Sequence, residues 1–135
     1  FIGEREGLSD ELNDLMDRAE KRTADRDGTI INLAVNYGGR LEIVRAVQRL
    51  AREGRDLTSI TEDDISSHIY TAGQPDADLI IRPSGEQRLS NFLLWQSAYS
   101  EFWYSDVLWP DFKDEDLYAA LSAYEKRNRR FGGTV

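Results

Sequence analysis

The sequence has 135 residues, of which 40% are hydrophobic and 31% charged, with no cysteine and a net charge of -8. This composition predicts one soluble globular domain, and no apolar run approaches the ~20 residues that a membrane-spanning helix needs. The acidic charge argues against nucleic acid, whose binding requires basic faces, and the lack of cysteine excludes disulfides and thiolate metal sites.

The first half of the chain predicts a helix, a strand and a second helix. Ser9 is a good N-cap residue for a helix with apolar residues on one face, which stops at the polar segment 25–28. The apolar segment 29–35 predicts a buried strand, followed by a Gly-Gly turn at its carboxyl end. Apolar residues at helical spacing then predict a helix over 40–53.

The middle of the chain continues the alternation. Thr61 and Asp64 have the spacing of a capping box, which predicts a short helix that reaches about Tyr70. Residues 78–82 include a short apolar run, typical of a buried parallel strand, and Pro83 ends it.

The last third of the sequence completes the predicted fold class. A helix is predicted from Asn91, a strand over 101–104, and a final helix over 114–129 that ends near Gly132. Strands that alternate with helices in this way predict an α/β fold, with a parallel β-sheet and helices on both faces.

The polar loop that follows residue 82 has the composition of an anion site. Arg82 and Arg88 enter it, and the N-cap candidates Ser90 and Asn91 would present the free N–H groups of the next helix to it. Two guanidinium forks and a hydroxyl suit a diphosphate better than a carboxylate. On these residues alone, simple surface pairing of both arginines with Glu86 and nearby acids is an equally good interpretation.

Three stretches of the sequence carry a family resemblance. They are INLAVNYGGRLEIVRAV (31–47), RPSGEQRLSNFLLWQSAYSEFWYSDVLWPDF (82–112) and RRFGG (129–133). All three resemble the cis-prenyltransferases, the family of undecaprenyl diphosphate synthase, and the long central motif is highly specific. The resemblance covers essentially the whole chain. It implies that residues 1–135 are the carboxyl-terminal part of a single isoprenyl transferase domain, with a partial cis-prenyltransferase fold.

One expected motif of the family does not occur in this sequence. The DGNGRWA-type segment supplies the family's principal catalytic aspartate and a phosphate-cradling loop, and no such segment is present. The resemblance therefore implies no catalytic residue within residues 1–135, and we expect that aspartate on a preceding segment or on another chain. The isolated fragment is accordingly expected to be inactive.

The resemblance implies condensation of isopentenyl diphosphate with an allylic diphosphate to make a polyprenyl diphosphate, with Mg²⁺ as cofactor. Glu101 matches the glutamate that binds Mg²⁺ in the family, and Mg²⁺ uses few protein carboxylates. Arg130 and Gly132 match an Arg-x-Gly motif that reaches across a homodimer to the partner's isopentenyl diphosphate. The implied substrate-binding residues are Arg82, Arg88, Leu89, Ser90, Arg130 and Gly132.

Simpler interpretations of single residues stand beside this one. Read without the family, Glu101 is an ordinary solvated acid and Arg130 is part of a basic helix end. His68 has no partner at metal-ligand spacing and is interpreted as a satisfied surface or helix-end histidine. A different function class, a non-catalytic partner subunit or interaction module of a heteromeric enzyme, also stays open. The expected location is cytoplasmic, peripheral at the membrane to which the product is delivered.

Overall fold

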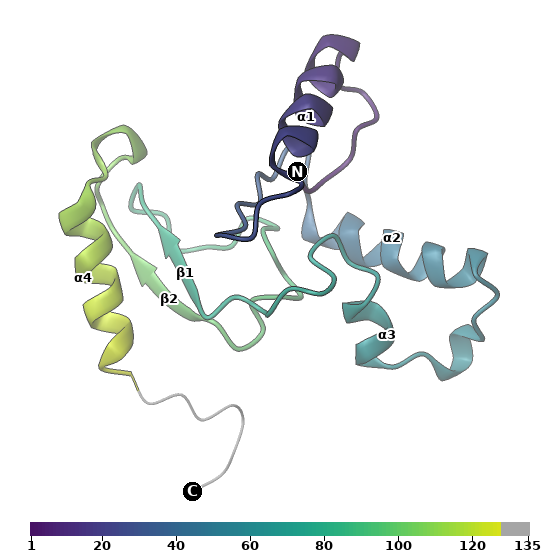
Figure 1. Ribbon diagram of the computed structural model, residues 1–135. Helices are drawn as coiled ribbons and strands as arrows, with labels where there is room; N and C mark the ends of the chain where they lie inside the picture. Colours follow the sequence, from purple (N-terminus) through teal and green to yellow (C-terminus); the bar gives the residue numbers. More distant parts are fainter. Residues whose placement is uncertain (128–135) are drawn as a thin grey trace, which may run out of the picture. The chain divides into compact units, whose positions relative to one another are not determined.

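The computed structural model describes residues 1–127, and they divide between two compact units. Unit 1 comprises residues 1–74 and unit 2 begins at Pro75 (Figure 1). The predicted site residues Arg130 and Gly132 lie outside the described residues. Among the helices of residues 1–127, none is both long enough and apolar enough to cross a membrane.

Helix α1 (Asp10–Thr23) of unit 1 begins where the sequence predicts. The Ser9 Oγ accepts a hydrogen bond of 3.2 Å from the Leu12 N–H, which satisfies one of the free donors of the first turn. Met16 is the buried residue of this helix, whereas the Leu15 side chain is about half exposed. The helix therefore contributes a narrow apolar stripe to the core of unit 1.

Helix α2 (Gly39–Arg52) forms the centre of unit 1, and it packs against the 3₁₀ turn η1 (Leu57–Ser59) and the short helix α3 (Glu62–Ser66). The predicted capping box is confirmed, because Thr61 and Asp64 each accept the other's backbone N–H. Helix α3 ends at Ser66, however, and residues 67–70 form turns rather than the predicted continuation. The buried apolar residues of unit 1 are Ile2, Met16, Ala46, Leu50, Ile65 and Ile69.

The prediction of a buried strand over 29–35 is wrong for this chain. The segment makes a single parallel bridge, between Ala34 and Ile2, and Ile30 and Ile31 are 69% and 76% exposed. A strand that is apolar on both faces needs neighbouring strands and covering helices to bury it. Among the described residues, only the start of the chain pairs with this segment.

Unit 2 contains the regular sheet of the described chain. Strand β1 (Leu79–Arg82) pairs in parallel with β2 (Glu101–Tyr104), as predicted, and the register places Leu79 opposite Glu101 and Arg82 opposite Tyr104. Helix α4 (Asp114–Glu125) packs against β2, after the 3₁₀ turn η2 (Trp109–Asp111) (Figure 1). The parallel α/β arrangement is confirmed.

The predicted helix from Asn91 does not form, and residues 91–99 make a series of turns. The backbone φ angle is positive at Ser90 (49°), Asn91 (65°) and Leu93 (44°), whereas a right-handed helix needs negative values. Short helices depend on tertiary packing for most of their stability, so the capping signal and the apolar run that follows it were not sufficient. Ser90 is therefore not a helix N-cap.

Replacement of Leu50 by alanine should destabilise unit 1 strongly. The Leu50 side chain is 2% exposed at the centre of the α2 packing, and a buried Leu→Ala change costs about 2–5 kcal/mol. The measurement is urea unfolding followed by far-UV circular dichroism, which reports mainly on the helices. Leu15→Ala is the matched control, because Leu15 is 47% exposed, and it should change stability by less than about 0.5 kcal/mol. Equal losses from both substitutions would contradict this core.

Candidate functional site

The loop after β1 is tied to the segment after β2 by three backbone hydrogen bonds. The Ser105 N–H donates to the Arg82 carbonyl at 3.1 Å, and the Ser84 and Gly85 N–H groups donate to the carbonyls of Val107 and Ser105 at 2.8 Å. Both segments therefore lie together at the carboxyl ends of the two strands. This is the edge of a parallel sheet at which α/β proteins bind their ligands.

A pocket of about 220 Å³ lies beside this loop. Two arginines, Arg82 and Arg88, contribute the positive charge of its wall, and most of the rest is apolar or aromatic. The lining residues are Ile80, Ile81, Arg82, Pro83, Arg88, Leu89, Phe92, Phe102 and Tyr104. A ligand with an anionic head and a hydrocarbon tail matches this combination.

The structure thus brings three of the sequence-predicted binding residues to one pocket: Arg82, Arg88 and Leu89. Ser90 follows Leu89 in the chain and is exposed, but it does not line the pocket. The predicted contribution of a helix N-terminus is also missing, because no helix begins at Ser90 or Asn91. Positive charge at this pocket therefore comes from side chains rather than from a helix dipole.

The two arginines have different partners. Arg88 forms an ion pair with Glu86, whereas a guanidinium nitrogen of Arg82 donates to the main-chain carbonyl of Arg88. Surface pairing with Glu86, one of the two interpretations of the sequence, thus occurs for Arg88. The Arg88 side chain is 67% exposed, and an exposed pair contributes only about 0–1 kcal/mol, so this ion pair adds little to stability.

Glu101, the predicted Mg²⁺ ligand, lies at the other end of the sheet. It starts β2 opposite Leu79, three residues before the position opposite Arg82, which corresponds to about 10 Å along the strand. Its Oε2 accepts a hydrogen bond from the Arg127 guanidinium at 2.9 Å. The described residues contain no cluster of three or more metal-ligating side chains. Glu101 and the arginine pocket are therefore not brought together within one chain.

Sequence reasoning missed two polar arrangements. The first is the Arg127–Glu101 ion pair, which joins residues 26 positions apart and so leaves no local signal. The second is Glu42, whose carboxylate is 1% exposed and accepts hydrogen bonds from the Tyr37 hydroxyl (2.5 Å) and the Tyr70 N–H (2.9 Å). Glu42 lies four and eight residues before Ala46 and Leu50, on the buried face of α2, and this spacing was the available hint.

The Tyr70 side chain is part of the same network in unit 1. Its hydroxyl donates to Glu4, which also accepts two hydrogen bonds from the Arg45 Nε and one of 2.7 Å from its Nη2. Burial, aided by the bond to Glu4, raises the pKa of Tyr70 to about 12, so the hydroxyl stays protonated and donates. The bonds from Arg45 and then Tyr70 lower the pKa of Glu4. This network anchors the start of the chain to α2.

The protein-family comparison gives a direct match. The family model described as "Putative undecaprenyl diphosphate synthase" matches residues 1–132. The chain belongs to this family. Curated members include the isoprenyl transferases of Lactococcus lactis, 54% identical over 137 residues, and Thermus thermophilus, 54% identical over 140 residues. These alignments cover 98% of the chain but 56% and 53% of the relatives, so the chain spans about half the length of the curated relatives it matches.

Solved structures agree with the family assignment. The crystal structure of lavandulyl diphosphate synthase from Lavandula x intermedia, in complex with dimethylallyl diphosphate, superposes with a TM-score of 0.92 at 40% identity. A probable undecaprenyl diphosphate synthase from Campylobacter jejuni gives a TM-score of 0.88 at 31% identity. The chain covers 58% and 61% of these two proteins, with 98% of its own length matched in each. The predicted partial cis-prenyltransferase fold is confirmed.

Gly85→Ala should disturb the pocket loop. Gly85 has a φ of +70°, and an added Cβ would lie 3.1 Å from the Asp106 Oδ1, so the substitution should destabilise unit 2 by about 1–2 kcal/mol. All three tryptophans lie in unit 2, so urea unfolding followed by tryptophan fluorescence measures this unit. Gly28→Ala, where an added Cβ meets nothing within 4 Å, is the control and should leave the transition in place. An unchanged transition in Gly85→Ala would show that the loop relaxes freely.

Proposed function

We propose that this chain is part of a cis-prenyltransferase, which condenses isopentenyl diphosphate with an allylic diphosphate to make a polyprenyl diphosphate. One observation carries the proposal, namely the pocket that Arg82 and Arg88 line together with aliphatic and aromatic side chains. An isoprenoid diphosphate has the same two parts, a multiply charged anionic head and a short branched hydrocarbon. The structural relative that binds dimethylallyl diphosphate supports this class of ligand.

The proposed role of the pocket is to hold isopentenyl diphosphate. Arg82 and Arg88 would clamp its diphosphate through bidentate contacts, and Ser90 and the backbone of Leu89 would add donors after a local movement of the 88–91 segment. Fixing the diphosphate in this way orients the alkene toward the allylic carbon, which converts an encounter between two substrates into a positioned reaction. This chain would therefore supply substrate positioning.

Glu101 is the proposed Mg²⁺ ligand of the chain. It fits that role chemically, since a single half-buried carboxylate already accommodates a cationic group, the Arg127 guanidinium, at 2.9 Å. Mg²⁺ typically uses one or two carboxylates and completes its shell with water and phosphate oxygens. When bound, Mg²⁺ would stabilise the negative charge that develops on the leaving diphosphate. To bind the metal, the Glu101 carboxylate would have to give up its ion pair with Arg127.

The proposal extends to assembly and location. Arg130 and Gly132 would act across a homodimer on the partner's isopentenyl diphosphate, and a second copy would also offer a route to combine Glu101 with an arginine pocket. A polyprenyl product is strongly apolar, which favours its delivery to a membrane by a cytoplasmic enzyme bound peripherally there. A non-catalytic role as partner subunit of a heteromeric enzyme is the alternative.

Arg88→Ala in the complete enzyme should raise the KM for isopentenyl diphosphate. We expect kcat/KM to fall by at least about tenfold, equivalent to roughly 1.4 kcal/mol of lost transition-state stabilisation. Arg88→Lys should restore only part of the loss, because an ammonium cannot reproduce a bidentate fork. Steady-state kinetics with varied isopentenyl diphosphate is the measurement.

Arg26→Ala provides the matched control for charge. Arg26 lies in unit 1 and is exposed, and the structure gives it an ion pair with the neighbouring Asp25. It should leave both kinetic constants unchanged. Wild-type kinetics in Arg88→Ala with an intact circular dichroism spectrum would remove Arg88 from the binding site. Prenyl transfer by the complete enzyme, at a rate similar to that of its relatives, would exclude the non-catalytic alternative.

The 135-residue chain by itself should not catalyse prenyl transfer. It spans about half the length of its curated relatives, and it contains no segment of the DGNGRWA type. The measurement is the incorporation of labelled isopentenyl diphosphate into lipid-extractable product, with and without the remaining portion of a relative such as the Lactococcus lactis protein. Magnesium-dependent turnover is expected only when both portions are present, and incorporation by the chain alone would disprove the expectation.

A further inference from the structure

The end of α2 is fixed by its own backbone. The Gly54 N–H donates to the Ala51 carbonyl at 3.1 Å, and the Arg55 N–H donates to the Leu50 carbonyl at 3.0 Å. Together with a φ of +80° at Gly54, these two bonds form a Schellman motif. The backbone of Glu53, directly before the glycine, is thereby held in place at the helix end.

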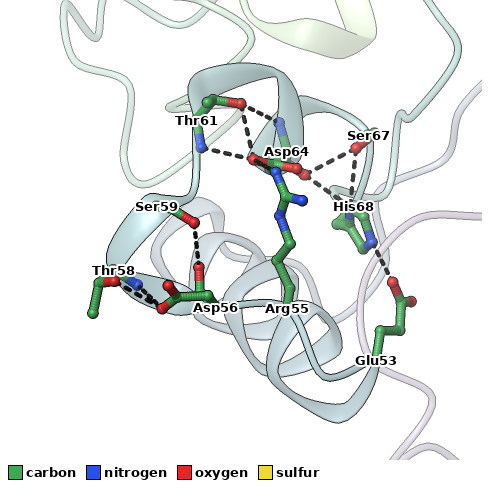
Figure 2. A network of polar contacts seen from close by, with 9 residues as sticks. All are labelled: Glu53, Arg55, Asp56, Thr58, Ser59, Thr61, Asp64, Ser67 and His68. Atoms are coloured by element: carbon green, nitrogen blue, oxygen red, sulfur yellow. Dashed lines mark hydrogen bonds and ion pairs between the residues drawn. The ribbon is translucent and has the colours of Figure 1, made fainter.

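His68, which follows α3, lies against this helix end (Figure 2). Its Nδ1 is 2.8 Å from the Asp64 main-chain carbonyl oxygen, and its Nε2 is 3.0 Å from the Glu53 Oε2. The Ser67 hydroxyl donates to the Asp64 carbonyl at 3.0 Å and lies 3.0 Å from the same Nδ1. The imidazole therefore bridges the two helix ends.

The chemistry of the two acceptors determines where the protons are. A carbonyl oxygen and a carboxylate oxygen only accept hydrogen bonds, so each ring nitrogen must carry a hydrogen to make both contacts. A neutral imidazole has one N–H and one lone pair, so it can donate to only one of the two oxygens; in the Nε2–H tautomer the Nδ1 lone pair can accept the Ser67 hydroxyl hydrogen. Only the doubly protonated imidazolium donates to the Asp64 carbonyl and the Glu53 carboxylate at once.

We propose that His68 is a protonation-dependent clamp, which joins the end of α2 to α3 when its imidazole is charged and releases the Glu53 carboxylate when it is neutral. Because the Ser67 hydroxyl donates to the Asp64 carbonyl, the neutral ring that keeps this arrangement is the Nδ1–H tautomer, which retains the bond to Asp64 and gives up the one to Glu53. This places a pH-sensitive contact in unit 1, outside the arginine pocket and independent of the proposed function.

The other charged groups around His68 do not change state in the same pH range. On the α2 side, Arg49 donates to the His68 carbonyl at 3.0 Å and stays cationic. On the α3 side, hydrogen bonds from the backbone and side chain of Thr61 hold the pKa of the Asp64 carboxyl below its usual range. Arg55 pairs with that carboxylate at 3.2 Å. His68 is thus the group of this cluster that titrates near neutrality.

The direction of the effect follows from the raised pKa of His68. The hydrogen bond to Glu53, and then that to the Asp64 carbonyl, raise this pKa above the ordinary value of 6.5. A group with a raised folded-state pKa stabilises the fold fully below its unfolded pKa, and this contribution is lost as the pH rises through the folded pKa. The clamp should therefore be closed in mild acid and open in mild alkali.

The single histidine of the sequence makes the test unambiguous, because its imidazole C–H resonances need no assignment. We would titrate the 135-residue chain by proton NMR and compare it with Glu53→Gln. The wild-type pKa should lie above 6.5, and Glu53→Gln should lower it toward that value. Glu62→Gln removes the same charge from the start of α3, away from the ring contacts, and should leave the His68 pKa unchanged.

A stability measurement separates the clamp from a merely structural contact. The loss of urea midpoint caused by Glu53→Gln should be present at about pH 5.5 and absent at about pH 9, and His68→Gln should show the same dependence. A His68 pKa at or below 6.5, or one that Glu53→Gln leaves unmoved, would overturn the proposal. A midpoint loss equal at both pH values would also overturn it, because the contact would then not depend on the proton.

Discussion

The parallel register of β1 and β2 is the constraint on which the candidate site depends. By pairing Arg82 with Tyr104, it makes both strands end at the same level, so that the two following loops can bond to each other. The arginine-bearing loop is then held on a rigid edge rather than free in solvent. The same register sends Glu101 to the opposite edge, where its carboxylate meets Arg127. One pairing thus places Arg82 and Glu101 at opposite ends of the same two strands.

The pocket wall shows how the sheet serves binding as well as folding. Adjacent strand residues point to opposite faces, so Phe102 and Tyr104 of β2 lie on the same face, where their rings stack at 6.1 Å. Both line the pocket together with residues of β1. The sheet that holds the loop therefore also supplies much of the apolar wall of the pocket.

Local signals allowed much of this structure to be predicted from the sequence. Ser9 caps α1, and Thr61 and Asp64 cap α3, because each of these patterns is determined by neighbours within a few residues. The strand 101–104 was predicted from its composition, although it pairs with β1. The predictions that failed depend on distant partners. Among the described residues, the segment 29–35 has strand composition but pairs only with Ile2, and the apolar run after Asn91 enters turns with positive φ. Local composition thus identifies the apolar segments of the chain, but it does not identify the segments that pack against them.

The candidate site likewise has features that the sequence could predict and features that it could not. The placement of Arg82 and Arg88 at a strand's carboxyl end could be predicted, because it needs only the strand and the break after it. The pairing of Glu101 with Arg127 and the burial of Glu42 could not, since both depend on contacts across long sequence separations. His68 is intermediate. Its satisfied state was predicted, but its position between two acceptors from different helix ends emerges only from the structure.

The exposed segment 29–33 has a consequence for the behaviour of the chain in solution. It joins Thr29, Ile30 and Ile31 to Leu33 without charge, proline or glycine, and its isoleucines are largely open to solvent. An uncharged extended segment with unpaired backbone groups is a template for intermolecular β-pairing and aggregation. A further strand paired with this segment would therefore protect the chain against aggregation as well as complete the sheet.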